Sequence, residues 1–164
     1  MTDEPAILDQ ILLQTGRLNY VWTNTESVLI HIMAGLLGTD KERAVVVFLT
    51  LNTTRARVDL VERLAKMKGR SPDERDAILA ATRKLVRLSG LRNHYNHCIY
   101  SFDTENGSAR TILMRIADRK TDIRMGRSEM IDETGLRRID EAIKDVTTLN
   151  LEFWHLVKAY GYPV

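Results

Sequence analysis

The chain has 164 residues, of which 44% are hydrophobic and 28% are charged, and its net charge at neutral pH is +2. These values are ordinary for a globular protein, and a content of only 3 prolines and 9 glycines excludes long coil regions. The length is typical of one domain, so residues 1–164 are expected to form a single domain with one core.

Three features of the sequence bear on its cellular compartment. Cys98 is the single cysteine, which excludes an internal disulfide and fits a reducing cytoplasm. The first ten residues, MTDEPAILDQ, are acidic, whereas a secretory signal begins with positive charge and an apolar stretch. No apolar run approaches the length of a membrane span. We therefore expect a cytoplasmic protein without a membrane partner.

The first half of the chain has the apolar spacing of helices. The segment from about Glu4 to Leu37 is predicted to be one long helix or two joined ones, with a candidate bend at Gly16 and a stop at Gly38. A second helix is predicted from about Asp40 to Lys68, starting at a polar N-cap. Its first half, AVVVFLTL, is apolar all round and is expected to be buried.

A third helix is predicted to begin at Ser71-Pro72-Asp73-Glu74. This segment supplies a serine cap, a proline at the first helical position and a glutamate that closes a capping box. Ser89-Gly90 is a candidate kink, after which the helical pattern resumes with Leu91, Tyr95 and Ile99.

The apolar period changes to two between about Ile99 and Arg127. Asn106-Gly107 and Asp118-Arg119-Lys120 supply turns, so this segment is predicted to be a β-hairpin or a three-stranded meander. A last helix follows from about Asp132 to Tyr160. The predicted fold class is mainly α: a four- to five-helix up-and-down bundle with the β-hairpin or short meander inserted before the last helix.

Positive charge is concentrated in two segments. The first basic segment, Arg55–Arg92, has 11 basic and 5 acidic residues, and the second, Arg110–Arg127, has 6 basic and 2 acidic residues. Their net charges are +6 and +4, whereas residues 1–42 and 128–152 each carry −4. These segments either form a patch for a polyanion or are simply the solvated faces of amphipathic elements.

Familiar catalytic and metal-binding motifs are absent from the sequence. It has no glycine-rich phosphate loop, no nucleophile elbow and no HExxH pattern. His94 and His97 are three residues apart, but without a third ligand they make a weak metal site, so neither a metal nor a cofactor is predicted. His31 and His155 lie in apolar helices and are interpreted as core or interface residues.

Other residues with reactive or large side chains have ordinary explanations. Trp22, Phe153 and Trp154 fall on apolar stripes and are expected in the core. Cys98 has apolar neighbours and no activating base nearby in the sequence, so an unreactive thiol is expected.

The segment Arg92–His97, RNHYNH, interrupts the apolar stripe of the third helix. Ile78 and Leu85 are seven residues apart, and Arg92 takes the next position, where a guanidinium is costly unless it is paired or faces an interface. Each residue of a helix advances by about 100°, so five polar side chains would lie within less than half of the helix circumference, provided that the helix reaches residue 100. These groups belong to Arg92, Asn93, Asn96, His97 and Tyr100.

Spacing alone leaves the role of this cluster open. Asn93 and His97 are four residues apart and are predicted to be within reach of each other, as a catalytic pair would be. A cluster of Arg, Asn and His can equally cap a helix end or hold a loop, and the predicted β segment starts directly after it.

At these residues the chain resembles the HEPN superfamily, helical-bundle domains found in many prokaryotic ribonucleases and toxins. The motif of that family is an arginine, a polar residue next to it and a histidine four to six positions after the arginine. Arg92, Asn93 and His97 match this pattern. The position of the motif, late in one helix and before another long helix, is also similar. The likeness is to small bacterial members in which a β-hairpin and a C-terminal helix follow the motif.

The resemblance implies a metal-independent endoribonuclease or toxin-like RNase that acts as a homodimer. His97 would give or take a proton, since histidine does so near neutral pH. Arg92 would hold the phosphate and stabilise its transition-state charge, and Asn93 would orient His97 or contact the phosphate. The implied partners are a second copy of the chain, RNA, and an antitoxin or other protein. The predicted substrate-binding residues are Arg87, Asn96 and Tyr100.

Two positions depart from the family pattern and support an alternative. Cys98 follows the motif histidine where many members have a small residue. Tyr100 lies three residues after that histidine, whereas toxins paired with nucleotidyltransferase antitoxins usually carry a tyrosine two residues after it. The alternative is a non-catalytic binding or assembly module in which Arg92 and His97 are structural. A small-ligand pocket in the bundle is a third option, for which the sequence names no ligand.

Overall fold

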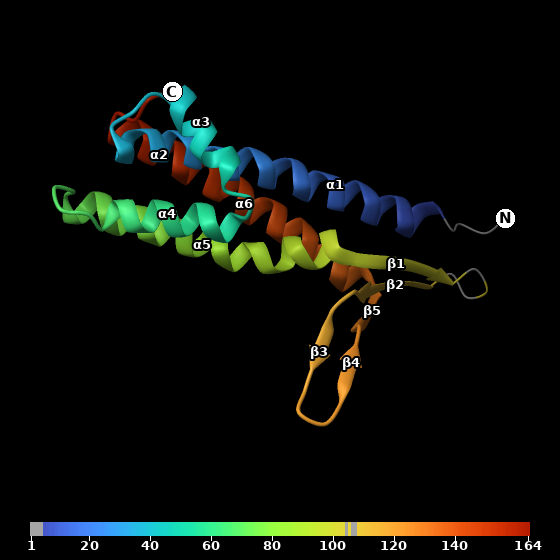
Figure 1. The fold of residues 1–164 in the computed structure, drawn as a ribbon. Helices are drawn as coiled ribbons and strands as arrows, with labels where there is room; N and C mark the ends of the chain where they lie inside the picture. Colours follow the sequence, from blue (N-terminus) through green and yellow to red (C-terminus); the bar gives the residue numbers. More distant parts are fainter. Residues whose placement is uncertain (1–4, 104, 106–107) are drawn as a thin grey trace. The chain divides into compact units, whose positions relative to one another are not determined.

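The computed structural model describes residues 5–103, 105 and 108–164 (Figure 1). The fold is mainly α-helical, with two small antiparallel sheets between the fifth and sixth helices. The elements are α1 (Pro5–Ser27), α2 (Leu29–Leu37), α3 (Lys41–Thr50), α4 (Thr54–Ala65), α5 (Pro72–His97), β1 (Cys98–Asp103), β2 (Ser108–Leu113), β3 (Ile116–Asp118), β4 (Ile123–Met125), β5 (Ser128–Ile131) and α6 (Glu133–Ala159).

The chain divides into two compact units. The helical unit comprises Val21–Ser89 and Lys144–Val164, and the sheet unit comprises Met1–Tyr20 and Gly90–Ile143. The chain passes from one unit to the other within α1, α5 and α6, so each of these helices contributes residues to both. That residues 1–164 fold as one domain stays a prediction.

The helical unit has a core of large apolar side chains from four helices. Fully buried residues include Trp22, Leu29, Ile32, Met33, Ile78, Leu85, Leu149 and Phe153. Burying such side chains contributes about 1.5–3 kcal/mol each, which is the main stabilising contribution in this unit. The prediction of core positions is confirmed for Trp22 and Phe153 but is wrong for Trp154, which is 39% exposed.

The first predicted helical segment consists of two joined helices, and the break is not at Gly16. α1 ends at Ser27 and α2 begins at Leu29, while the helix is continuous through Gly16. At the break the Val28 N–H donates to the Thr25 carbonyl (3.2 Å). This bond reaches back three residues, as in a 3₁₀ turn, and not four as in an α-helix.

Gly38 ends α2 as predicted. Its φ of 63° is left-handed, a conformation that glycine adopts without a steric penalty. Its N–H donates to the Gly35 carbonyl and the N–H of Thr39 donates to the Ala34 carbonyl, which together form a Schellman motif.

The second predicted helix is wrong as a single element. It divides into α3 and α4 because Leu51 is extended and Thr53 starts a new helix, with its side chain accepting from the Ala56 N–H (3.1 Å). The expected burial of AVVVFLTL is also wrong. Only Ala44 and Phe48 are buried in α3.

The third and last predicted helices are confirmed, and so is the serine cap of the third. The Ser71 hydroxyl accepts from the Glu74 N–H (3.1 Å), and α5 is continuous through Ser89-Gly90 up to His97. Asp132 caps α6, where its carboxylate accepts from the Gly135 N–H (2.9 Å).

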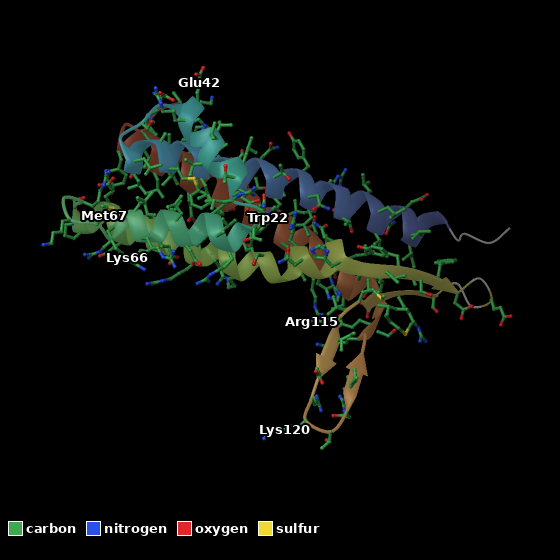
Figure 2. All side chains as sticks on the ribbon, viewed as in Figure 1. Trp22, Glu42, Lys66, Met67, Arg115 and Lys120 are labelled. Atoms are coloured by element: carbon green, nitrogen blue, oxygen red, sulfur yellow. The ribbon has the colours of Figure 1, made fainter. Side chains whose placement is uncertain are left out.

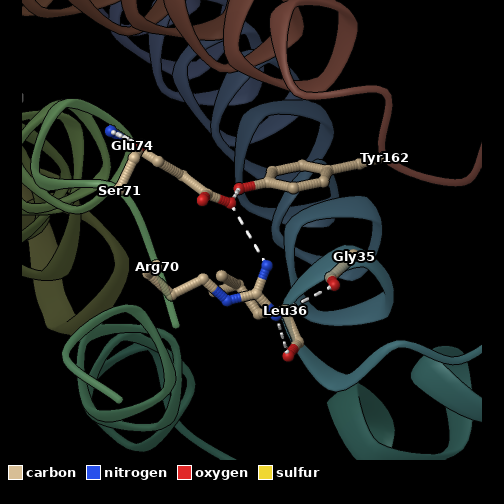
Figure 3. Close-up of polar contacts among 6 residues, drawn as sticks. All are labelled: Gly35, Leu36, Arg70, Ser71, Glu74 and Tyr162. Carbon is tan, nitrogen blue, oxygen red and sulfur yellow. Dashed lines mark hydrogen bonds and ion pairs between the residues drawn. The ribbon is translucent and has the colours of Figure 1, made fainter. Parts of the chain in front are cut away.

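The C-terminal residues are held to α2 and α5 by a buried polar cluster (Figure 3). The Glu74 carboxylate is not available for a capping box, because it accepts from the Tyr162 hydroxyl (2.6 Å) and the Arg70 guanidinium (3.3 Å). Arg70 also donates to the Leu36 carbonyl (2.6 Å) at the C-terminal end of α2. The Tyr162 ring lies so close to Gly35 that a Cβ at residue 35 would meet it at 2.0 Å.

His31 is a satisfied buried histidine, as predicted. It is 8% exposed, and its Nδ1 lies 2.7 Å from the Pro163 carbonyl oxygen. His155 is exposed, so it is not a core residue, and the predicted position at an interface stays a prediction.

The sheet unit contains the β segment predicted between the third and last helices, which extends further than expected. β1, β2 and β5 form one antiparallel sheet in the order β1-β2-β5, and β3 and β4 form a separate antiparallel pair. A small cluster of Ile11, Ala109 and Ile131 is buried in this unit, with Tyr100, Phe102 and Leu136 packed against it. The predicted turn at Asn106-Gly107 lies outside the described residues.

No helix in the part of the chain that the structure describes is long and apolar enough to cross a membrane.

Candidate functional site

The motif of Arg92, Asn93 and His97 lies at the C-terminal end of α5, in the sheet unit. Arg92 is half-buried, whereas Asn93 and His97 are exposed. The Arg92 guanidinium donates to the Asn93 side-chain oxygen (3.0 Å). The predicted direct contact of Asn93 with His97 is not found among the hydrogen bonds of the described residues. The structure therefore brings a cation and an amide together and places an accessible imidazole on the same end of the helix.

Asn96 joins the motif arginine to α1. Its amide lies between Arg92 and Asn19, and the orientation that satisfies both has the Asn96 oxygen accepting from Arg92 Nε (2.9 Å). In that orientation the Asn96 nitrogen donates to the Asn19 side-chain oxygen (2.9 Å). Arg92 is thus paired in the half-buried position where the sequence predicted that pairing or an interface would be needed.

Tyr100 does not lie on the helical face with the motif, because α5 ends at His97 and Tyr100 belongs to β1. Its hydroxyl donates to the Tyr95 carbonyl (2.8 Å) and lies 3.3 Å from the Thr15 hydroxyl. Burial raises the pKa of Tyr100 to about 12. These contacts hold the start of β1 to α1, and the predicted role in substrate binding stays a prediction.

Arg87, the third predicted substrate-binding residue, is exposed and lies on the part of α5 that belongs to the helical unit.

His94 faces the three-stranded sheet. Its Nε2 lies 3.4 Å from the Thr111 hydroxyl and 3.9 Å from the Glu129 carboxylate. Its ring packs edge-on against Tyr95, with ring centroids 5.0 Å apart. His94 is therefore half-buried between α5 and the sheet, and Thr111, Glu129 and Tyr95 hold it in place.

A polar cavity of about 270 Å³ is lined in part by the three residues that contact His94, and no sequence pattern indicated it. Its lining includes the buried Tyr95 and Thr111, together with Glu129, Asp132 and Arg138. Burial raises the pKa of the Tyr95 hydroxyl. These residues come from α5, β2, β5 and the start of α6, so only tertiary structure brings them together.

Cys98 and the histidines do not form a metal-binding group in the described part of the chain, where no cluster of three or more potential ligand residues is found. Burial raises the pKa of the Cys98 thiol, which favours the unreactive protonated form as predicted.

The two basic segments differ in how their charge is paired. In the first segment six cations form ion pairs with carboxylates: Arg55, Arg57, Lys66, Arg70, Arg75 and Lys84. In the second segment only Arg127 has an ion pair among the described residues, with Glu129 at 2.9 Å. Three pairs of the first segment are four residues apart, a spacing that the sequence already contained: Arg55–Asp59, Glu62–Lys66 and Arg70–Glu74.

Comparison with known proteins found no match to this chain. No family model matches the chain, and neither a curated protein nor a solved structure matches it.

Proposed function

We propose that this chain is a HEPN-like, metal-independent endoribonuclease of the toxin-like kind, acting as a homodimer. The observation that carries the proposal is the grouping of Arg92, Asn93 and His97 on the last two turns of α5. The finer fold that belongs to this proposal is an up-and-down bundle with a β-hairpin inserted before the last helix. The proposed partners are a second copy of the chain, RNA, and an antitoxin or other protein.

The proposed reaction uses the RNA's own 2′-hydroxyl as nucleophile. A base removes the 2′-hydroxyl proton, the 2′-oxygen attacks the adjacent phosphorus, and the bond from phosphorus to the 5′-oxygen breaks. The products are a 2′,3′-cyclic phosphate and a 5′-hydroxyl, whose oxygen receives a proton from an acid. An imidazole serves either step near neutral pH, and the exposed His97 is accessible to a substrate.

Arg92 supplies the positive charge that this transition state needs. A guanidinium can hold two phosphate oxygens at once, and its attraction to them increases as negative charge develops on them. Its hydrogen bonds with Asn93 and Asn96 fix the position of the side chain before substrate binds. A fixed donor avoids the cost of reorganisation during the reaction.

Exposed apolar residues on α1 support the homodimer. Leu12 and Leu13 are each more than half exposed, and Tyr20 is 71% exposed, all on the part of α1 that belongs to the sheet unit. Exposed apolar residues that gather on one element are typical of protein interfaces. A second copy would cover these residues and bring a second motif to the site.

The test is cleavage of labelled RNA by the purified protein in excess EDTA. His97→Ala is expected to lower the rate by about 10²–10⁴-fold, the usual contribution of a general acid or base. His155→Ala is the matched control, since His155 is also an exposed helical histidine but lies outside the motif. Full activity of His97→Ala would refute the assignment.

One observation favours a second candidate function, a non-catalytic binding or assembly module. Arg92 is linked through Asn96 to Asn19 on α1, as expected of an arginine that only holds two helices together. In that case Arg92→Ala lowers the melting temperature, and the wild type cleaves no RNA in the same assay. An unchanged melting temperature would count against this candidate.

A further inference from the structure

The hairpin formed by β3 and β4 stands apart from the three-stranded sheet of the same unit (Figure 1). We call residues 114–127 the hairpin arm. Ile116 pairs with Met125 and Asp118 with Ile123, and the arm is closed by a bond from the Arg119 N–H to the Asp122 carbonyl (3.0 Å). At its base the Gly126 N–H donates to the Arg115 carbonyl (3.0 Å).

Most of the arm is open to solvent. Residues 114–124 of the arm are all exposed, and Ile116 and Ile123 retain 65% and 63% exposure. A two-stranded hairpin on its own is only marginally stable in water. Such an element is rarely retained for stability, so its surface chemistry indicates its role.

The charge of the arm is positive and largely unpaired. It contains five basic residues and two acidic ones. Four of the basic residues form no ion pair with any described residue: Arg115, Arg119, Lys120 and Arg124. Arg115 and Lys120 are seen at the base and the tip of the arm (Figure 2). Because successive residues of a strand point to opposite faces, Arg124 lies on the face opposite to Ile116 and Ile123.

We infer that the hairpin arm binds the phosphate backbone of RNA and supplies most of the protein's affinity for it. Four unpaired cations on one exposed hairpin match a polyanion, and neutralising phosphates releases counterions. Contacts to phosphates carry little sequence information, so the arm is expected to bind RNA without strong sequence preference. This inference deepens the proposed ribonuclease function, on which the choice of RNA rests, and it places binding and cleavage on different elements.

The first basic segment serves as the internal comparison. Six of its 11 cations already have carboxylate partners, and binding RNA through these six would require ion pairs to break. The four arm cations without an ion pair to any described residue need no such rearrangement. RNA affinity is therefore expected to depend on the arm far more than the +4 and +6 net charges of the two segments suggest.

The experiment measures binding of a fluorescein-labelled 2′-O-methyl RNA by anisotropy. This RNA lacks the free 2′-hydroxyl, so binding is measured whether or not the protein is a ribonuclease. The arm variant combines Arg115→Gln, Arg119→Gln and Arg124→Gln. The matched control removes three exposed cations outside both basic segments: Arg17→Gln, Arg137→Gln and Lys158→Gln.

Loss of three phosphate contacts at 0.1 M salt is expected to weaken binding by about 100-fold and to reduce the salt slope by about 2. The control variant is expected to stay within a few-fold of the wild type. Any of three results would overturn the inference: equal loss of affinity in both variants, an arm variant that binds as tightly as the wild type, or a wild type that binds no RNA.

A third variant, Ile116→Ser with Ile123→Ser, keeps the charge. If it alone loses binding, the arm acts through its apolar face and the inference is wrong.

Failure of this inference is distinguishable from failure of the proposed function. Cleavage of ordinary RNA by the wild type, with normal binding by the arm variant, would retain the ribonuclease and reject the arm. Loss of binding by the arm variant, without cleavage by the wild type, would retain the arm and reject the ribonuclease.

Discussion

The two basic segments have similar charge in the sequence and different surroundings in the structure. In the first segment six of 11 cations form ion pairs with carboxylates, including the nearly buried pair of Arg57 and Glu26 (3.1 Å). In the second segment Arg127 is the one cation with an ion pair among the described residues. Net charge of a segment therefore says little about what it can bind until the ion pairs are known. More of the first segment's charge is engaged in ion pairs, and more of the second segment's charge is open to a ligand.

The largest effect on stability is expected from breaking the buried pair in the first segment. Arg57→Met leaves the Glu26 carboxylate buried without its cation and also removes the stacking of the guanidinium on Phe48 (3.9 Å). Breaking such a pair costs roughly 3–5 kcal/mol. Urea unfolding measures the loss, and a double variant with Glu26→Gln is expected to recover part of it. A loss below 1 kcal/mol would show that the pair is not structural.

Gly35→Ala tests the buried cluster around Arg70 and Tyr162. The added methyl would overlap the Tyr162 ring, which must then move away from Glu74. Overpacking of this kind costs about 1–3 kcal/mol. Thermal unfolding is the measurement, and Gly16→Ala is the control, since nothing lies within 4 Å of a Cβ at residue 16. A stabilised Gly35→Ala protein would contradict the packing described above.

Much of the fold could be predicted from local signals. Ser71 and Pro72 mark the start of α5, Gly38 marks the end of α2, and the change of apolar period marks the β segment. The break between α3 and α4 was missed because an apolar run hides it, although Thr53 is an ordinary N-cap residue. The end of α5 at His97 agrees with the predicted start of the β segment at about Ile99.

The candidate site shows the same division between local and tertiary information. Arg92 and Asn96 are four residues apart on one helix, so their contact could be expected from spacing, whereas the contact expected between Asn93 and His97 is not found among the described residues. Asn19 joins them from a distant part of the chain, and no sequence pattern indicates that contact. The same holds for the pairing of Lys84 with Glu152, whereas the ion pairs at a spacing of four residues were visible in the sequence.

Alkaline pH is expected to lower the stability of the protein. The folded-state pKa of Tyr100 is about 12, against an ordinary value of 10.0, because the side chain is partly buried. Between these values the unfolded chain loses the proton first, so the contribution of Tyr100 is full below pH 10 and is lost as pH rises toward 12. Unfolding free energies at pH 8, 10 and 11 measure the decline. Tyr100→Phe should show a weaker decline, and an unchanged one would contradict this assignment.

The smallest effects on stability are expected at exposed cations. Lys84→Gln removes an exposed ion pair with Glu152 and should cost less than about 1 kcal/mol. Arg124→Gln in the arm removes no ion pair and should change stability by less than about 0.5 kcal/mol, while still weakening RNA binding. Chemical unfolding of both variants checks these values. A large loss for Arg124→Gln would mean that the arm's charge is structural.

The most direct test measures binding and single-turnover cleavage of the same RNA in parallel, in excess EDTA, for two variants. The arm variant is expected to reach the wild-type cleavage rate at saturation but to need about 100-fold more protein. His97→Ala is expected to bind RNA like the wild type and to cleave it about 10²–10⁴-fold more slowly. If His97→Ala cleaves at the wild-type rate, or if the arm variant binds as tightly as the wild type, the separation of cleavage at the end of α5 from binding by the hairpin arm is contradicted.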